Sequence, residues 1–546
     1  MKRAAARATI AALFTLCAVV AAHAEIVISK KPTQNMNCNA GVCTPTAQNA
    51  VLNVGDLTNM LAAGNATVQT GNGDGTAAAI VIADGFSWTN TTRLTLSAKK
   101  SITVKAPVTV AGPGALNISY NIGHTNGDLY FQRNGRITFR RLSSNLVIQG
   151  VTFALVNDVP HLAQIMTSNP SGFLALANNY DAAIDGTYKT ALADHFSGIL
   201  EGLGHALQNV SVSGGSSGSS FIRTLDSGAV VRNLAFENAD IEVLPRHQQP
   251  AGLILYNHGA LENVSLSGNV SGEYHVGAVA ATNESDGAIR NATVSATVYS
   301  GGDAGGITGY NQGTIVRATA SGSVSGSLMT ACFAPYTGGL VGQNLGSITL
   351  SRSSASVNGG HGEYKQEGCE VYARAGGLAG VNDGLIDRSF ATGNVTAGEY
   401  SYAGGLVGYI HGTVSNAYSA GAAHTDTFKT RVGGLSGYNV GPIATSYSIG
   451  APTGGDPNND CPAGGLIGCD GAPAGSITSS YWDFDTSGIS DPSRGAGDPP
   501  NDPGVTGLTD PQLRSALPDG FDPKIWGSNL NINNGYPYLR ANPPPK

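Results

Sequence analysis

The segment from Gly338 to Ile348 reads GGLVGQNLGSI, and copies of it recur along the second half of the chain. Clear copies begin at Gly305, Gly376, Gly404, Gly433 and, in broken form, Gly464, and weaker ones begin at Gly252 and Gly277. Successive clear copies start 33, 38, 28, 29 and 31 residues apart. A unit of this length cannot bury its own apolar face, so neighbouring units must stack. The repeat therefore predicts a solenoid.

Composition indicates that the solenoid is built from strands. Glycine accounts for 75 of the 546 residues, and charged residues for only 12%. Abundant small residues with few helix formers suit short strands joined by tight corners. We expect an all-β fold, a right-handed parallel β-helix with one short helical segment and an irregular C-terminal cap. The helix is predicted near Asp158–Met166, where Asp158 can cap it and Pro160 lies in its first turn.

Each position of the repeat has an expected role. The Leu at the third position and the Ile or Val at the eleventh should point into the core. The glycines at the fifth and ninth positions should allow positive φ at a corner. Two columns should then form across stacked coils, an asparagine ladder with steps of about 4.8 Å and an aromatic column that packs against core or cap. Their members are Asn311, Asn344, Asn382 and Asn439, and Phe390, Tyr418, Tyr447 and Tyr481.

The pattern divides the chain into five parts. Residues 1–24 read as a signal peptide, with Lys2, Arg3 and Arg7 before an apolar run and an Ala22-His23-Ala24 cleavage site. Residues 25–145 form an N-terminal solenoid segment, 146–212 a helix-containing connecting segment, 213–480 the repeat β-helix and 481–546 the C-terminal cap and tail. We expect an exported protein at the cell surface, outside the cell or in the periplasm, with no membrane span. Without the signal its net charge is near −10 and no basic cluster remains, so nucleic acid is not an expected partner.

Six cysteines remain after the signal, and their positions favour three disulfides over a metal site. Cys38 with Cys43 and Cys461 with Cys469 would close short loops. Cys332 and Cys369 precede successive repeats, so stacking would bring them together. No metal or cofactor is expected.

The repeat resembles the GLUG repeat of large bacterial surface proteins, over Gly252 to Ile477. Upstream phrases such as Leu146-Val147-Ile148-Gln149-Gly150, and the ending Tyr536-Pro537-Tyr538-Leu539, resemble filamentous-haemagglutinin-like exoproteins. The resemblance implies a secreted or surface-displayed parallel β-helix, often associated with adhesion. An opening haemagglutination-activity domain is not identifiable, which departs from some of these relatives.

Catalytic signatures were weighed against this expectation. The zinc-protease pattern H-E-x-x-H and the adjacent aspartates of pectin-type hydrolases are absent from the sequence. Gly214–Gly218 fits G-x-S-x-G only by letter, because it lies in a Gly/Ser tract. Glu363, Glu367 and Glu370 cluster near His361, where a carboxylate pair could cleave a glycan, although a polar loop explains them as well.

We therefore expect a non-enzymatic, adhesin-like interaction protein whose ligand is a glycan or a protein. The alternatives are a carbohydrate-binding or carbohydrate-cleaving β-helix and a purely structural spacer. The residues of the regular coil are used in contacts between stacked coils. Ligand binding is therefore expected in the insertions Met329–Thr337 and His361–Arg374. Their candidate interaction residues are Phe333, Tyr336, Tyr364, Lys365, Glu367 and Tyr372.

Overall fold

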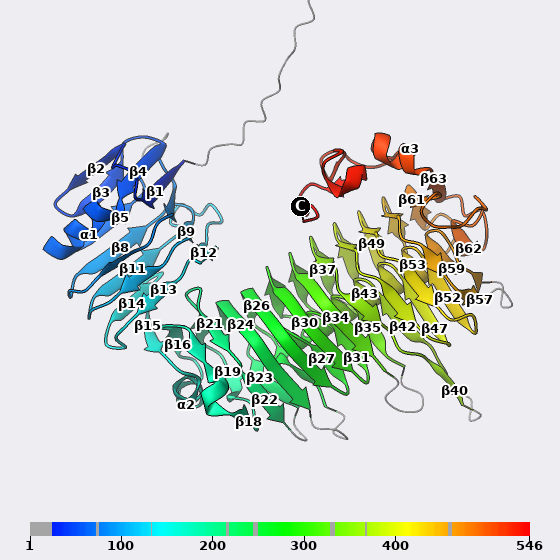
Figure 1. Cartoon of the computed structure of the whole chain (residues 1–546), viewed down its shortest axis with the longest axis horizontal. Coiled ribbons are helices and arrows are strands. Elements are labelled where there is room, and N and C mark those ends of the chain that lie inside the picture. The colour runs from blue at the N-terminus through cyan, green and yellow to red at the C-terminus, as the bar shows by residue number, and fades with distance from the viewer. Residues whose placement is uncertain are drawn as a thin grey trace, which may run out of the picture. The chain divides into compact units, whose positions relative to one another are not determined.

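The computed structural model describes residues 24–71, 76–132, 134–214, 218–243, 249–327, 334–365, 369–456 and 461–545 (Figure 1). The expected signal peptide lies outside this range, apart from Ala24. The described chain forms two compact units. The first comprises residues up to 108 with 114–135 and 148–150, and the second comprises 109–113, 136–147 and the chain from 151 onward.

Parallel strands stack into coils in the first unit. Strand β1 (Glu25–Ser29) pairs in parallel with both β4 (Asn49–Asn53) and β6 (Ala79–Ile82), which aligns Ile26 with Ala50 and Ile80. A second wall contains β3 (Val42–Pro45), β5 (Ala66–Gln69), β8 (Arg93–Ser97) and β11 (Ala115–Ser119). Alternate residues of these strands are buried, as expected of strands with one face on a core.

Helix α1 (Val54–Ala63) of the first unit was missed by the sequence analysis, which expected a single helix. The Asn53 side chain caps it by accepting a hydrogen bond from the Gly55 backbone N–H at 2.8 Å, and Leu57 and Leu61 are buried. The cap and the spacing of the two leucines are ordinary helix signals. They were hidden by the alternating strands on both sides.

The predicted helix, α2 (Val159–Ser168), lies in the second unit. The carboxylate of Asp158 accepts the His161 backbone N–H at 2.7 Å, and Leu162 and Met166 are buried. A third helix, α3 (Asp510–Ser515), lies in the C-terminal segment.

The long wall of the second unit is a 17-stranded sheet that runs from β19 (Ala193–Phe196) to β62 (Ala496–Asp498) (Figure 1). Each repeat contributes two short strands to it, such as β42 (Ala373–Gly376) and β43 (Ala379–Asn382). The other wall contains long strands, among them β24 (Val230–Val243), β26 (Ala260–Gly272), β30 (Thr293–Ser300) and β34 (Thr319–Gly326), paired in parallel. The parallel β-helix expected from the repeat is therefore present.

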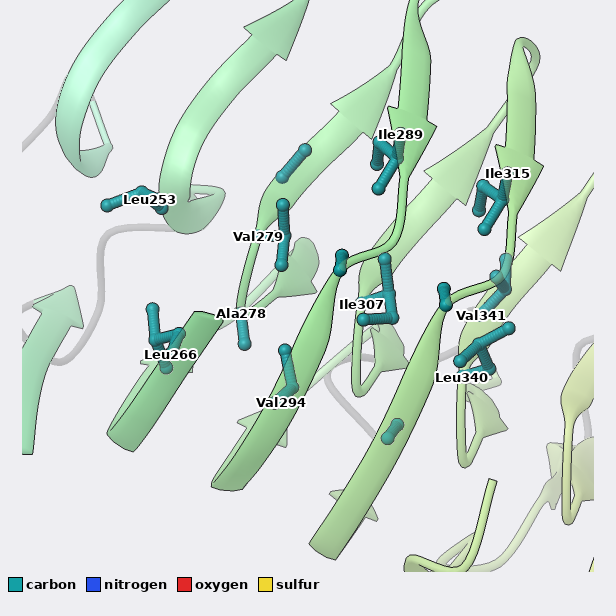
Figure 2. Packing of buried hydrophobic residues seen from close by; sticks show 14 of the residues in the cluster. Leu253, Leu266, Ala278, Val279, Ile289, Val294, Ile307, Ile315, Leu340 and Val341 are labelled. Atoms are coloured by element: carbon teal, nitrogen blue, oxygen red, sulfur yellow. The ribbon is translucent and has the colours of Figure 1, made fainter. Parts of the chain in front are cut away.

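The third position of the repeat forms the predicted inner column. Leu340, Leu378, Leu406 and Leu435 are fully buried, and each backbone N–H donates to the carbonyl of the leucine one coil further along. Figure 2 shows the same stacking for Ile307 and Leu340, with Ile289 and Ile315 on the adjoining strands.

The asparagine ladder is confirmed and extends beyond the prediction. Amide-to-amide hydrogen bonds of 2.6–2.7 Å link Asn257, Asn283, Asn311, Asn344 and Asn382 in sequence. Ile410 occupies the next position and interrupts the ladder, so that Asn382 donates to the Thr413 carbonyl instead. Asn439 donates to Asp470.

The glycines have a different role from the predicted one. None of the fifth- and ninth-position glycines in the copies that begin at Gly305, Gly338, Gly376, Gly404 and Gly433 has positive φ, whereas Gly475 of the broken copy, level with Gly441, does. Glycine is needed there for close approach: a Cβ on Gly346, for example, would lie 2.0 Å from the Gly313 carbonyl oxygen. Positive φ occurs instead two residues after the Ile or Val, at non-glycine residues including Arg317, Leu350 and Arg388.

The aromatic column packs against the C-terminal cap, as predicted. Phe390, Tyr418 and Tyr447 stack with centroids 4.6 and 5.0 Å apart. Trp526 and Phe521 of the cap lie against them, and the Tyr447 hydroxyl donates to the Pro537 carbonyl at 2.6 Å. This column belongs to the core and is unavailable to a ligand.

Candidate functional site

Two columns of side chains lie on the face of the 17-stranded sheet that points away from the leucine core, although Thr282, Asp303, Val381 and Tyr402 among them are themselves buried. The first comes from the second position before each Gly-Gly pair, and backbone pairing places its members level with one another. It consists of His275, Asp303, Tyr336, Arg374, Tyr402 and Arg431. The second comes from the sixth position of the repeat and includes Tyr256, Thr282, Tyr310, Gln343, Val381, Tyr409 and Tyr438. In a strand, alternate residues face the core. Core packing therefore restricts the residue types next to these columns and not those in the columns themselves.

The two columns meet in what we call the tyrosine–arginine patch, formed by Tyr336, Tyr372, Arg374, Tyr402, Tyr409, Arg431 and Tyr438. The Arg374 guanidinium lies 4.7 Å from the centroid of the Tyr336 ring and 4.9 Å from that of Tyr409. The Arg431 guanidinium lies 4.8 Å from Tyr402 and 4.2 Å from Tyr438. Two cation–π contacts hold each guanidinium in place.

Neither arginine forms an ion pair with a carboxylate of the described residues. In that part of the chain, arginine–carboxylate pairs involve Arg232, Arg290, Arg388 and Arg514. Nε of Arg374 is buried without a hydrogen-bond partner there. Each guanidinium is thus oriented by aromatic rings and not by a direct ion pair with a described acidic side chain.

Tyrosine hydroxyls add hydrogen-bonding capacity to this face. Arg431 donates to the Tyr402 hydroxyl at 3.3 Å, and Tyr409 stacks on Tyr438 with centroids 5.4 Å apart. Burial raises the pKa of Tyr402 and of Tyr409. Both hydroxyls therefore stay protonated at neutral pH and can donate as well as accept.

A pocket of about 190 Å³ adjoins the patch at one end. It is lined by Tyr372 and Arg431 of the patch together with Lys429, Thr430, Asp456 and Cys461. Among the described residues that line this pocket, two are cations and one is a carboxylate. In a chain with only 30 basic residues, this concentration of positive charge is local.

A second recess lies further along the same sheet, and we call it the tyrosine–histidine cleft. It has a volume of about 350 Å³ and is lined by Gln249, Pro250, Tyr256, Tyr274, His275, Thr282, Glu284, Tyr310 and Gln312. His275 stacks on Tyr310 with centroids 5.0 Å apart. Aromatic faces combined with amide and carboxylate groups are suited to recognition.

A buried carboxylate lies behind this cleft. Oδ2 of Asp303 is 2.9 Å from Nδ1 of His275, yet Oδ1 of Asp303 has no hydrogen-bond partner among the described residues. Burial raises the pKa of Asp303, against the opposing effects of His275, of a hydrogen bond from the Tyr336 backbone and of the Arg374 charge. The buried carboxylate is therefore held by His275 and the Tyr336 backbone, and its charge is opposed by that of Arg374.

The predicted interaction loops are only partly described. Phe333, Glu367 and the cysteine Cys332 lie outside the described residues. Tyr364, Lys365 and Cys369 lie in an antiparallel hairpin of β40 (Glu363–Lys365) and β41 (Cys369–Val371) whose backbone alone is described at these positions. Tyr336 belongs to strand β35 (Tyr336–Gly338), and Tyr372 stacks on Tyr402 with centroids 4.8 Å apart. Both side chains contact the sheet face.

Two of the three predicted disulfides are confirmed, Cys38–Cys43 and Cys461–Cys469. The pairing of Cys332 with Cys369 stays a prediction. No group of three metal-ligating side chains occurs among the described residues. In the same part of the chain, no helix has the length and hydropathy needed to cross a membrane.

Carboxylates also meet away from the patch. A pocket of about 500 Å³ is lined by Asn358, Gly360, His361, Gly398, Glu399 and Asp426. Glu399 and Asp426 were not singled out from the sequence, and they are the acidic groups that a carbohydrate-cleaving site here would use.

The outward columns were also missed, although the sequence contains a signal for them. The two residues before each Gly-Gly pair read Asp-Ala, Tyr-Thr, Arg-Ala, Tyr-Ala and Arg-Val in consecutive clear copies. The first of these two positions holds only aromatic or charged residues, next to a Gly-Gly motif that is repeated in each of these copies. Residues of these types are not typical of a core position. Binding residues were expected only in the insertions, and none were expected on the strands of the regular coil.

Comparison with known proteins gives little further information. No family model matches the chain. Over 168 residues the chain is 25% identical to halomucin from Haloquadratum walsbyi, a match that covers 30% of this chain and 2% of halomucin. The crystal structure of a Bacteroides ovatus protein, provisionally named an immunoglobulin A1 protease, overlaps 71% of this chain and 93% of its own, with a TM-score of 0.30 and 16% identity. The strand pairing within this chain, and not these similarities, defines its fold.

Proposed function

We propose that this protein is an exported, non-enzymatic binding protein of the adhesin-like type, and that it binds through the outward face of the 17-stranded sheet. The observation that carries the proposal is the tyrosine–arginine patch. It presents aromatic rings and two guanidinium groups that form no ion pair with a described carboxylate, and aromatic residues and arginine are the types that dominate binding energy at interfaces.

Export and surface location are part of the proposal. The N-terminal signal pattern and the two disulfides support it, because disulfides persist in oxidising compartments outside the cytosol. The similarity of the repeat to GLUG repeats and the partial match to halomucin are in keeping with a surface protein. The solenoid supplies a long, stiff support on which such a face is held at fixed spacing.

The proposal is tested by incubating the purified protein with a glycan array and a soluble polysaccharide panel, while reducing ends are assayed. We expect binding without release of reducing ends. Tyr438→Ala should weaken that binding about tenfold or more, because Tyr438 stacks on Tyr409 and supports Arg431.

Tyr299→Ala is the matched control, since Tyr299 is 46% exposed and lies on β30 of the other wall. It should leave binding unchanged. Release of reducing ends that is lost in Glu399→Gln would contradict the non-enzymatic role. Equal effects of the two tyrosine substitutions would contradict the placement of the binding face.

A further inference from the structure

We infer that the ligand of the tyrosine–arginine patch is an extended acidic polysaccharide that presents one carboxylate to the protein per disaccharide, held by Arg374 and Arg431. This inference rests on the proposed function and narrows it to one chemical class.

The state of the two arginines indicates an anionic ligand. The Arg374 guanidinium lies over the rings of Tyr336 and Tyr409, and that of Arg431 over the rings of Tyr402 and Tyr438. Nε of Arg374 is buried and one N–H group of Arg431 is bonded to the Tyr402 hydroxyl, so the other terminal N–H groups are the ones that can bind an anion. A guanidinium edge matches a carboxylate in geometry and can bind it through two parallel hydrogen bonds. The rings also fix the orientation of each side chain before a ligand arrives, which reduces the entropy lost on binding.

The spacing of the arginines selects among anionic polymers. Backbone pairing aligns Arg374 with Tyr402 and Tyr402 with Arg431, so the two arginines are two coils apart. Adjacent strands lie about 4.8 Å apart, which separates the arginine positions by about 10 Å. This is close to the length of a disaccharide in an extended polysaccharide.

An extended acidic peptide fits this spacing less well. Side chains on one face of an extended peptide recur every second residue, about 6.7 Å apart. The spacing of successive carboxylates on such a peptide would therefore not match the spacing of the two arginines.

The pocket beside the patch adds a second cation next to Arg431. Lys429 and Arg431 line it together with Tyr372. Lys429 lies two residues before Arg431 in the same coil, so it widens the cationic site across that coil, while the next position of the first column is Pro462. The predicted contact along the solenoid axis is therefore made by Arg374 and Arg431, with Lys429 beside it.

The test uses the full-length mature protein and three defined probes: a hyaluronan decasaccharide, oligomannuronate of similar length, and the hyaluronan decasaccharide with its carboxyls reduced to alcohols. We expect at least one of the two acidic probes to bind, and the reduced probe to bind at least tenfold more weakly. Affinity should fall as salt is raised, because the contacts are between opposite charges. Poly-glutamate serves as the acidic peptide and should bind more weakly than the acidic glycan.

Arg374→Gln and Arg431→Gln should each weaken binding of the acidic probe about tenfold or more, while Arg317→Gln, on an exposed corner outside the sheet, should not. Circular dichroism and thermal unfolding would check that each variant is folded. The inference is overturned if neither acidic probe binds, if carboxyl reduction has no effect, if poly-glutamate binds as tightly, or if all three arginine variants behave alike. Binding of a neutral glycan that depends on Tyr438 but not on Arg374 would overturn the inference and leave the proposed function standing.

Discussion

Leu406→Ala should lower the free energy of unfolding by roughly 2–5 kcal/mol, as for other large-to-small changes at buried positions. Leu406 is fully buried, its N–H donates to the Leu435 carbonyl, and its carbonyl accepts from Leu378. The coils on both sides are fixed by these backbone hydrogen bonds, so the cavity cannot collapse easily. Chemical denaturation followed by far-UV circular dichroism measures the change.

Leu385→Ala is the control for this prediction. Leu385 lies in strand β44 (Leu385–Asp387) of a neighbouring coil but is 37% exposed. Its truncation should change stability by about 0.5 kcal/mol or less. If the two substitutions had the same effect, the inner leucine column would not be the core of the solenoid.

Trp526→Ala should destabilise the C-terminal end of the solenoid by about 3–5 kcal/mol. Trp526 is fully buried, packs on Tyr447 and Phe521, and donates from Nε1 to Oδ1 of Asn416 at 3.3 Å. In a stacked repeat protein each coil is stabilised by its neighbours, so loss of a cap acts first on the coils nearest to it. The aromatic column should then become exposed to solvent.

Hydrogen exchange resolved by peptide distinguishes this local effect from a global one. We expect faster exchange in peptides that contain Tyr418 and Tyr447 and little change near Ile289. Leu530→Ala, in the same segment but 77% exposed, should leave exchange unaltered. Uniform acceleration along the solenoid would show that the C-terminal segment is not a separate cap.

The parts of the fold that could be predicted are those set by periodicity. The third-position leucines and the asparagine corner recur at intervals that only stacked coils can satisfy, and both columns are present. The role of the glycines was predicted wrongly, because a sequence shows where glycine occurs but not whether its missing Cβ is needed for positive φ or for close approach. At Gly346 the missing Cβ is needed for close approach to Gly313 of the preceding coil.

The candidate site was harder to predict because its members are far apart in the sequence. Arg374 contacts Tyr336 and Tyr409, which are 38 and 35 residues away, and only the register of the coils brings them together. Register depends on the insertion in each repeat, whose path cannot be derived from periodicity. Tyr336 and Tyr372 were singled out as interaction residues of the insertions, whereas the structure places both side chains against the sheet face.

The central claim is that the outward columns of the 17-stranded sheet, and not the insertions, form the binding face. Hydroxyl-radical footprinting of the protein bound to the tightest ligand of the polysaccharide panel tests this directly. The account predicts that Tyr409 and Tyr438 lose reactivity in the complex while the exposed Tyr299 on the other wall keeps it. Protection of Tyr364 or Tyr299, with Tyr409 and Tyr438 as reactive as in the free protein, would contradict it.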